Sequence, residues 1–137
     1  MGESLQHIKL VNTIKHRAEE IVQESFKGFI LLDLPESKEK PPQMSEGFRP
    51  DLYYCHNGIM IIGEAKTSYD FEKRHSQEQY LSYMKACLRF KGTAIMIVAV
   101  PWTESRAAKN LLRRIKRKNS FDVHINVLDD VGQVGQV

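Results

Sequence analysis

The stretch GFRPDLYYCHNGIMIIGEAK, residues 47–66, decides how the chain can fold. Asn57-Gly58 is a strong signal for a two-residue turn, because a type I′ turn needs positive φ at both central positions. The flanking segments DLYYC and IMII are rich in aromatic and β-branched residues, which favour strands. We therefore predict a β-hairpin with strands at residues 48–55 and 58–66.

The two ends of this hairpin carry charges that a buried hairpin does not need. Asp51 and Glu64 each lie six residues from the nearer turn residue, so their carboxylates are expected to face each other across the strands. Lys66 lies two residues beyond Glu64 and projects from the same face, whereas Ala65 points away. Two facing carboxylates repel, and a hard divalent cation such as Mg²⁺ removes that penalty because it takes oxygen ligands.

A lysine beside such a cation can hold an attacking water or offset the negative charge that builds on a phosphate. The triad Asp51, Glu64 and Lys66 therefore suits the hydrolysis of a phosphodiester bond. The alternative is structural: Glu64 and Lys66 could form an ordinary ion pair at a strand end, and Asp51 could simply begin a strand. The apolar strand that leads into the charges, together with the matched lengths of the two arms, favours the functional interpretation.

At 137 residues, with 42% hydrophobic and 27% charged side chains, the chain has the composition of one globular domain. No run reaches the roughly 18 apolar residues that a membrane helix needs, so no membrane partner is expected. Cys55 and Cys87 lack metal-ligand spacing and fit reduced core thiols of a cytoplasmic protein. We expect a single domain over residues 1–130 and a disordered tail, VGQVGQV, over residues 131–137.

Hydrophobic periodicity places the other elements. An amphipathic helix is predicted at residues 4–24 and a short apolar strand at residues 28–35. After the hairpin, Ser76 and Gln79 predict a capping box at the start of a second helix. The remaining predictions are polar loops at 36–46 and 67–75, a strand covered on both faces at 93–100, a basic helix at 103–118 and an edge strand at 121–129.

The resulting order is α-β-β-β-α-β-α-β, which predicts an α/β fold with a mixed central β-sheet flanked by helices. The apolar runs at 59–62 and 93–100 need cover on both sides, so helices are expected on both faces of the sheet. The helix between the strands at 58–66 and 93–100 forms a crossover, and these two strands should therefore be parallel.

The hairpin also carries a resemblance to a known family. PD at residues 50–51, followed by EAK at residues 64–66, resembles the signature of the PD-(D/E)XK nuclease superfamily. GFRPD at residues 47–51 and QYLSY at residues 79–83 are similar to two motifs of its RecB-type exonuclease branch. The resemblance implies a restriction-endonuclease-like fold, whose core is a helix, three antiparallel strands, a crossover helix and a further strand.

The resemblance also implies roles for the hairpin residues. Asp51, Glu64 and the carbonyl oxygen of Ala65 would bind Mg²⁺ or Mn²⁺. Lys66 would position the attacking water or stabilise the developing charge. The implied reaction is metal-dependent cleavage of nucleic acid.

The predicted helices contribute further candidate site residues. Gln79 and Tyr83 lie one helical turn apart, where they could reach the nucleic-acid backbone or support Lys66. A helix-surface position for Gln79 and a packed Tyr83 are the plain alternative. Many relatives also use a glutamate from the first helix, and Glu20 is preferred here over Glu19 as a catalytic residue.

Residues 106–118, RAAKNLLRRIKRK, hold seven basic side chains and no acidic one, although the net charge of the chain is only +3. A solvated helix face is the usual explanation of such a run, but a nuclease needs phosphate neutralisation, so we expect this helix to contact DNA. Arg49 is a further candidate for a phosphate contact, or it lies at the rim of the sheet. The nucleic-acid-binding candidates are Arg49, Tyr83, Arg106, Lys109, Arg113, Arg114 and Arg117, with Lys116 and Lys118 beside them.

The sequence therefore predicts a Mg²⁺-dependent deoxyribonuclease, with an endonuclease favoured over an exonuclease or a Holliday junction resolvase. A non-catalytic nucleic-acid-binding or assembly module of the same fold is the alternative from a different class. The motifs include no sequence-reading module, so recognition of the DNA backbone or of DNA structure is expected. Because the chain has one site, cutting both strands would favour a homodimer or a larger assembly.

Overall fold

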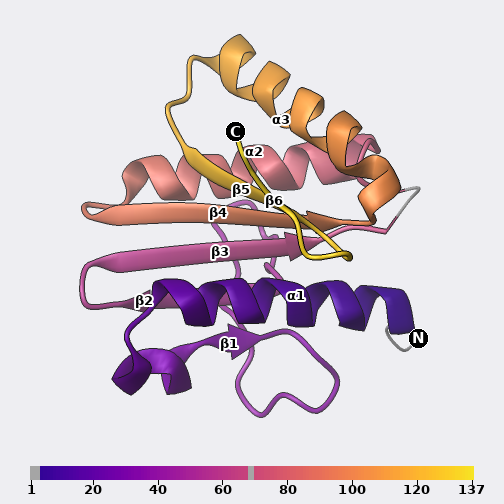
Figure 1. The fold of residues 1–137 in the computed structure, drawn as a ribbon. Helices are drawn as coiled ribbons and strands as arrows, with labels where there is room; N and C mark the ends of the chain where they lie inside the picture. Colours follow the sequence, from indigo (N-terminus) through magenta and orange to yellow (C-terminus); the bar gives the residue numbers. More distant parts are fainter. Residues whose placement is uncertain (1–3, 68–69) are drawn as a thin grey trace.

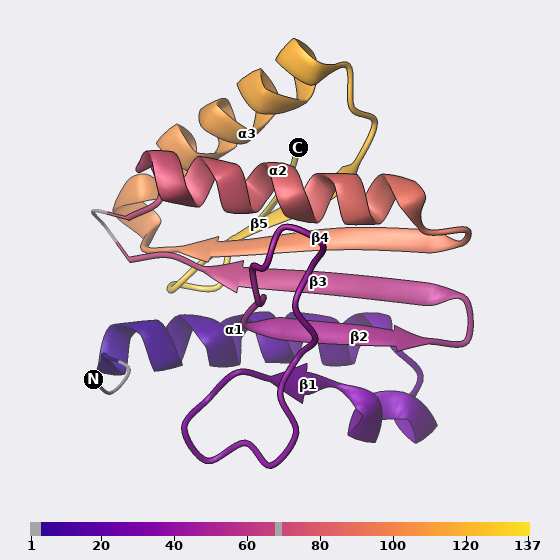
Figure 2. The same cartoon turned by 180° about the vertical axis from the view of Figure 1, so that it is seen from behind.

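The computed structural model describes residues 4–67 and 70–137, and it arranges them in three layers with a β-sheet between helices (Figures 1 and 2). The sheet has six strands in the order β1-β2-β3-β4-β5-β6. The strands are β1 (Leu31–Leu32), β2 (Leu52–His56), β3 (Ile59–Ala65), β4 (Thr93–Val100), β5 (His124–Asp129) and β6 (Val134–Gln136). The helices are α1 (Leu5–Ile21), α2 (Arg74–Arg89) and α3 (Ser105–Asn119), with short 3-10 helices η1 (Glu24–Phe29) and η2 (Trp102–Glu104).

The sheet is mixed, as the sequence predicts. β2 is antiparallel to both β1 and β3, the strands β3, β4 and β5 are parallel, and β6 is antiparallel to β5. The prediction that the strands before and after the crossover helix are parallel is therefore confirmed. Part of the predicted loop at 67–75, residues 68–69, lies outside the described residues. No helix in the described part of the chain is long and apolar enough to cross a membrane.

The predicted hairpin is β2 and β3 with a tight turn between them. Asn57 has φ of 53° and Gly58 has φ of 77°, the positive values that the turn requires. The pairing runs without a bulge from His56 opposite Ile59 to Leu52 opposite Gly63. The next position in this register sets residue 51 against residue 64, as the arm lengths predict.

The two faces of the sheet are covered by different helices. On β3, Met60 and Ile62 belong to the apolar cluster beneath α2 and α3, whereas Ile61 and Ala65 belong to the cluster beneath α1. Figure 1 shows α1 over one face, and Figure 2 shows α2 and α3 over the other. The prediction that the central apolar strands are covered on both sides is confirmed.

All three long helices begin at the same end of the sheet, where the parallel strands β3 and β4 end (Figure 2). The free N–H groups of a helix start carry partial positive charge. Ligands of open α/β sheets bind outside the carboxyl ends of the parallel strands. An anion-binding site is therefore expected at this end of the molecule.

The predicted strand at 28–35 is largely wrong. The chain instead forms η1, and only Leu31 and Leu32 pair with β2. Phe29 is half exposed and stacks on His56 at the end of the hairpin, with ring centroids 4.4 Å apart. The apolar run is divided because its first part packs against the hairpin end and only its second part meets the edge of the sheet.

The predicted capping box of the second helix is also wrong. α2 begins at Arg74 after Lys73, which makes no side-chain cap. Ser76 lies inside the first turn, where its hydroxyl donates to the carbonyl oxygen of Asp70 at 2.5 Å. Its partner in the predicted box, Gln79, is buried and turned toward the sheet instead.

The predicted disordered tail, residues 131–137, forms a turn and the strand β6. The Asp129 carboxylate accepts the N–H groups of Val131 and Gln133, both at 3.0 Å, and so fixes the turn. β6 then pairs with β5, and the strand predicted at 121–129 is not at the edge of the sheet. The tail has little apolar surface of its own, and its structure comes from the free edge of β5.

Candidate active site

Several polar side chains meet at the carboxyl end of β3, and two of them, Asp51 and Glu64, are carboxylates from facing strand positions. Asp51 is 7% exposed and Glu64 is 5% exposed. One oxygen of Asp51, Oδ2, accepts the backbone N–H of Ala65 at 2.9 Å. Asp51 thus closes the open end of the hairpin and holds its carboxylate beside Glu64.

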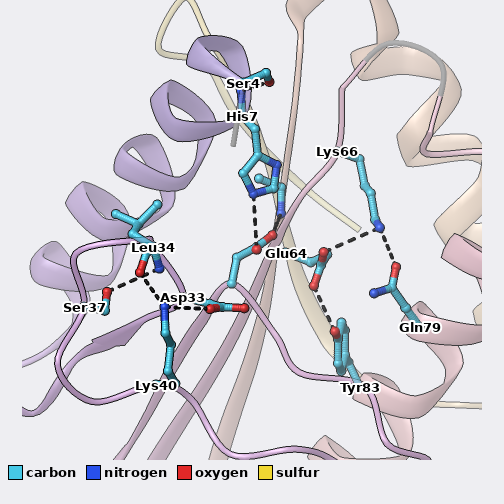
Figure 3. Close-up of polar contacts among 12 residues, drawn as sticks. Ser4, His7, Asp33, Leu34, Ser37, Lys40, Glu64, Lys66, Gln79 and Tyr83 are labelled. Atoms are coloured by element: carbon cyan, nitrogen blue, oxygen red, sulfur yellow. Dashed lines mark hydrogen bonds and ion pairs between the residues drawn. The ribbon is translucent and has the colours of Figure 1, made fainter. Parts of the chain in front are cut away.

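Glu64 is held by donors from two elements (Figure 3). The Tyr83 hydroxyl of α2 donates to Glu64 Oε1 at 2.8 Å. Lys66 Nζ lies 3.5 Å from Glu64 Oε2, which confirms that both side chains project from the same face. Lys66 also donates to the side-chain oxygen of Gln79. The ion pair that was the structural alternative for these residues is therefore present.

Burial and charge act together on Glu64. Burial raises the pKa of this carboxyl well above its usual range, and the neighbouring Asp51 charge raises it further. The Lys66 ammonium and the Tyr83 hydrogen bond oppose this rise in pKa but do not cancel it. One amine thus compensates two adjacent carboxylates only in part, so the site would gain from a further cation.

His7, which lies in the first turn of α1, was not among the site residues predicted from the sequence. Its Nε2 is 3.3 Å from Asp51 Oδ1, and its side chain is 18% exposed. His7 continues the buried stripe of Val11, Ile14 and Ala18 by one helical turn toward the N-terminus. That periodicity is the signal that could have located it.

Glu20, the candidate predicted from the first helix, lies away from the other site residues. It lies thirteen residues after His7, which is about 20 Å along a helix that rises 1.5 Å per residue. Its side chain is 67% exposed and pairs with Arg17 at 3.4 Å. Because α1 runs along the sheet from the site end, only its first turn reaches Asp51.

The two α2 residues are both part of the site, but one has a different role from that expected. Gln79 supports Lys66, which was one of the predicted alternatives. Tyr83 is fully buried, as in the packed position that was the plain alternative to a contact with nucleic acid. Its hydroxyl donates to Glu64 instead.

The predicted phosphate-binding residues lie on the surface at differing distances from this site. Arg49 is exposed two residues before Asp51. α3 buries Ala108, Leu111, Leu112 and Ile115 against the sheet and leaves its cations on the outer side. Figure 2 shows α3 starting at the site end and leaving it obliquely. Of its cations, Arg106 lies nearest that end of the helix, followed by Lys109, Arg113, Arg114, Lys116, Arg117 and Lys118.

The donor set at the end of β3 fits a hard divalent cation. Among residues 4–67 and 70–137, no three His, Cys, Asp or Glu side chains form a ready-made metal group. The Asp51 and Glu64 carboxylates and the backbone around Ala65 offer oxygen atoms, and the His7 imidazole lies beside Asp51. Mg²⁺ commonly binds through one or two carboxylates and keeps several waters, so this smaller set is sufficient for it.

We compared the chain with known protein families, curated proteins and solved structures. None of the three comparisons gave a match. The function of the site is therefore argued below from its residues and their geometry.

Proposed function

We propose that this protein is a metal-dependent nuclease that hydrolyses DNA phosphodiester bonds and is related in fold to the PD-(D/E)XK nucleases. The observation that carries the proposal is the meeting of Asp51, Glu64 and Lys66 at the carboxyl end of β3. Two buried carboxylates with one amine are costly as a purely structural feature. The same three groups are the equipment that phosphodiester hydrolysis needs.

In this proposal, Asp51, Glu64 and the Ala65 carbonyl oxygen would hold Mg²⁺ or Mn²⁺. When bound, the cation would polarise the scissile phosphate and lower the pKa of a bound water. The His7 imidazole, 3.3 Å from Asp51, would fix the orientation of that carboxylate or add a nitrogen donor. The start of α1 thereby contributes to the site.

Lys66 would act on the substrate directly. Its ammonium is held between Glu64 Oε2 and the Gln79 oxygen, so its position is set by two partners. From there it would donate a hydrogen bond to the attacking water or to a non-bridging phosphate oxygen. In hydrolysis the water oxygen bonds to phosphorus as the bond to the leaving sugar oxygen breaks, and negative charge builds on the phosphoryl oxygens.

One observation favours a second candidate, a nucleic-acid-binding module without catalysis. Both oxygens of Asp51 and both oxygens of Glu64 have a protein partner. Each carboxylate oxygen thus has a partner without a cation, although the two negative charges are compensated only in part. The two candidates differ in one measurable respect, because only the nuclease needs a metal at Asp51 and Glu64.

Thermal unfolding with and without metal tests the site. We expect Mn²⁺ or Mg²⁺ to raise the melting temperature of the protein, because a ligand that binds only the folded state stabilises it. Asp51→Asn should abolish this rise, since the amide oxygen can still accept the Ala65 N–H but carries no charge. Asp122→Asn, at an exposed carboxylate beyond the end of α3, is the matched control and should respond to metal like the parent.

Cleavage assays on linear duplex, single-stranded and four-way-junction DNA complete the test. We expect cleavage with Mg²⁺ or Mn²⁺, none with EDTA, and none with Asp51→Asn. DNA binding without metal-dependent cleavage of any substrate would support the non-catalytic module instead. An Asp51→Asn variant as active as the parent would contradict the proposed metal site.

Tyr83→Phe tests the support of Glu64. The variant removes the hydroxyl that donates to Glu64 Oε1 and keeps the ring in place. Groups that orient a metal-binding carboxylate are typically worth about 10- to 100-fold in metal affinity or activity, so we expect a loss of about tenfold in Mn²⁺ affinity by calorimetry. Tyr80→Phe is the control on the same helix, because the Tyr80 hydroxyl donates to the carbonyl of Phe71 and should leave Mn²⁺ affinity unchanged. Equal losses in both variants would contradict a specific role of Tyr83.

A further inference from the structure

Trp102 is the single tryptophan of the chain, and 60% of its surface is exposed. It lies in η2, immediately after β4 and Pro101. Its backbone N–H donates to Asp130 Oδ1 at 2.8 Å, so its place in the fold is fixed although its ring is open to solvent. A large aromatic ring kept exposed at a fixed position is a candidate contact surface.

The position of Trp102 links it to the candidate active site. The backbone N–H of Lys66 donates to the carbonyl oxygen of Ala99 at 2.9 Å, so the end of β4 lies directly beside the end of β3. Trp102 follows Ala99 by three residues, a chain distance of at most about 10 Å. A strand of nucleic acid that passes Lys66 can therefore extend over Trp102.

A row of cations continues from Trp102 along α3. Arg106, Lys109 and Arg113 recur at helical spacing, and together with Trp102 and Ser105 they line one surface hollow. No acidic side chain lines this hollow. The nearby acidic residues are Glu104, in η2, and Asp130, whose Oδ1 accepts the Trp102 N–H.

The end of the Lys109 side chain packs closely against a glycine on β6. A Cβ atom at Gly135 would lie 2.4 Å from Lys109 Cε and 2.7 Å from its Nζ. The end of the lysine side chain therefore lies against the β6 backbone, and a side chain at position 135 would require it to shift. The C-terminal strand, absent from the sequence prediction, thus helps to shape the cationic row.

We propose that Trp102, Arg106, Lys109 and Arg113 bind an unpaired segment of DNA, with a base stacked on the indole ring and phosphates on the three cations. Bases in a duplex stack on one another, so only unpaired nucleotides present a free ring face to Trp102. This proposal rests on the proposed function, in which the strand held here leads to Lys66 and is cleaved there. It makes the substrate a DNA with a single-stranded segment next to the cleaved bond.

The chemistry of the hollow favours DNA over a protein partner. Tryptophan and arginine are also common at protein interfaces, but charge is depleted at the centres of such interfaces, whereas this hollow carries three cations and no acidic side chain and so matches a row of phosphates. A stacked base over an aromatic ring beside a positively charged groove is the general arrangement for single-strand binding. Strong salt dependence follows from the phosphate contacts.

Because Trp102 is the single tryptophan, its fluorescence reports on this surface alone. We would titrate the full chain with oligothymidylate, and separately with a blunt-ended linear duplex, in EDTA so that no cleavage occurs. We expect oligothymidylate to quench Trp102 emission at lower concentration than the duplex, and added salt to weaken the quenching. Equal quenching by both DNAs, or none by either, would overturn the proposal.

Variants test the ring itself, with fluorescence anisotropy of a labelled oligonucleotide as the readout. Trp102→Ala should weaken single-strand binding about 5- to 150-fold, since one base–aromatic stack is worth about 1–3 kcal/mol. Trp102→Phe should restore much of it. Phe29→Ala, at an exposed aromatic ring at the other end of the hairpin, is the matched control and should bind like the parent.

The outcomes separate this inference from the nuclease proposal. Metal-dependent cleavage with no response of Trp102 to single-stranded DNA would leave the nuclease and overturn the Trp102 surface. A response of Trp102 to single-stranded DNA without metal-dependent cleavage would keep the Trp102 surface and overturn the nuclease proposal. A Trp102 emission that shifts with protein concentration and not with DNA would identify the surface as a contact between copies of the chain, which also overturns the proposal.

Discussion

Replacement of Lys66 by methionine is expected to lower the rate of metal-dependent DNA cleavage by about 10²- to 10³-fold. Methionine fills much of the space of the lysine stem but carries no charge and no N–H donor. Loss of one donor aimed at the charge that develops in a transition state has an effect of this size. The measurement is single-turnover cleavage at saturating Mg²⁺, with the melting temperature recorded alongside to show that the variant is folded.

Lys73→Met is the matched control for this prediction. Lys73 lies at the start of α2, is 63% exposed and pairs with Asp70 at 2.9 Å. Lys73→Met should lower the cleavage rate far less than Lys66→Met, because the charge of Lys73 is screened by solvent. Similar losses in both variants would mean that Lys66 acts only through the general positive charge of this surface.

Gly63→Ala should strongly lower the stability of the fold. A Cβ atom at Gly63 would lie 2.6 Å from Ile14 Cγ2 and 3.1 Å from Leu52 Cβ. Overpacking of this kind costs about 1–3 kcal/mol in the free energy of unfolding. Relief of the clash moves α1 away from β3, which also moves His7 away from Asp51. We therefore expect a lower urea midpoint and, in the same variant, weaker binding of Mn²⁺.

Two further variants make this prediction specific. Gly28→Ala is the control, because nothing lies within 4 Å of a Cβ atom at Gly28, so its urea midpoint should equal that of the parent or exceed it slightly. In the double variant Ile14→Ala/Gly63→Ala the clash is removed, so the loss should be smaller than the sum of the two single losses. Strict additivity would show that Gly63 and Ile14 do not compete for the same space.

The hairpin and the three residues at its ends could be predicted because their geometry is local. The turn at Asn57-Gly58 sets the register, and equal arm lengths set position 51 against position 64 whatever the rest of the chain does. Alternation along the strand then places Lys66 on the face of Glu64. The parallel pairing of β3 and β4 followed in the same way from the helix between them.

The residues that were misplaced depend on contacts between distant parts of the chain. Glu20 and His7 are both polar residues of α1, and only the direction in which α1 crosses the sheet decides that His7 is the one beside Asp51. For Tyr83 the sequence left a contact with nucleic acid and a packed position both open, and the packing of α2 on the sheet turns its hydroxyl to Glu64. Helical periodicity gives the spacing of such residues and not the element that each face will meet.

The sequence by itself determined the mixed α/β architecture, the register of the hairpin and the meeting of Asp51, Glu64 and Lys66. Each of these follows from turn chemistry and from the periods of helices and strands, which act over a few residues. Only the tertiary structure decided the contribution of His7, the burial of Tyr83, the strand β6 and the row of cations that begins at Trp102. These depend on which surfaces pack together across the sheet, and a packing partner distant in sequence leaves no local pattern.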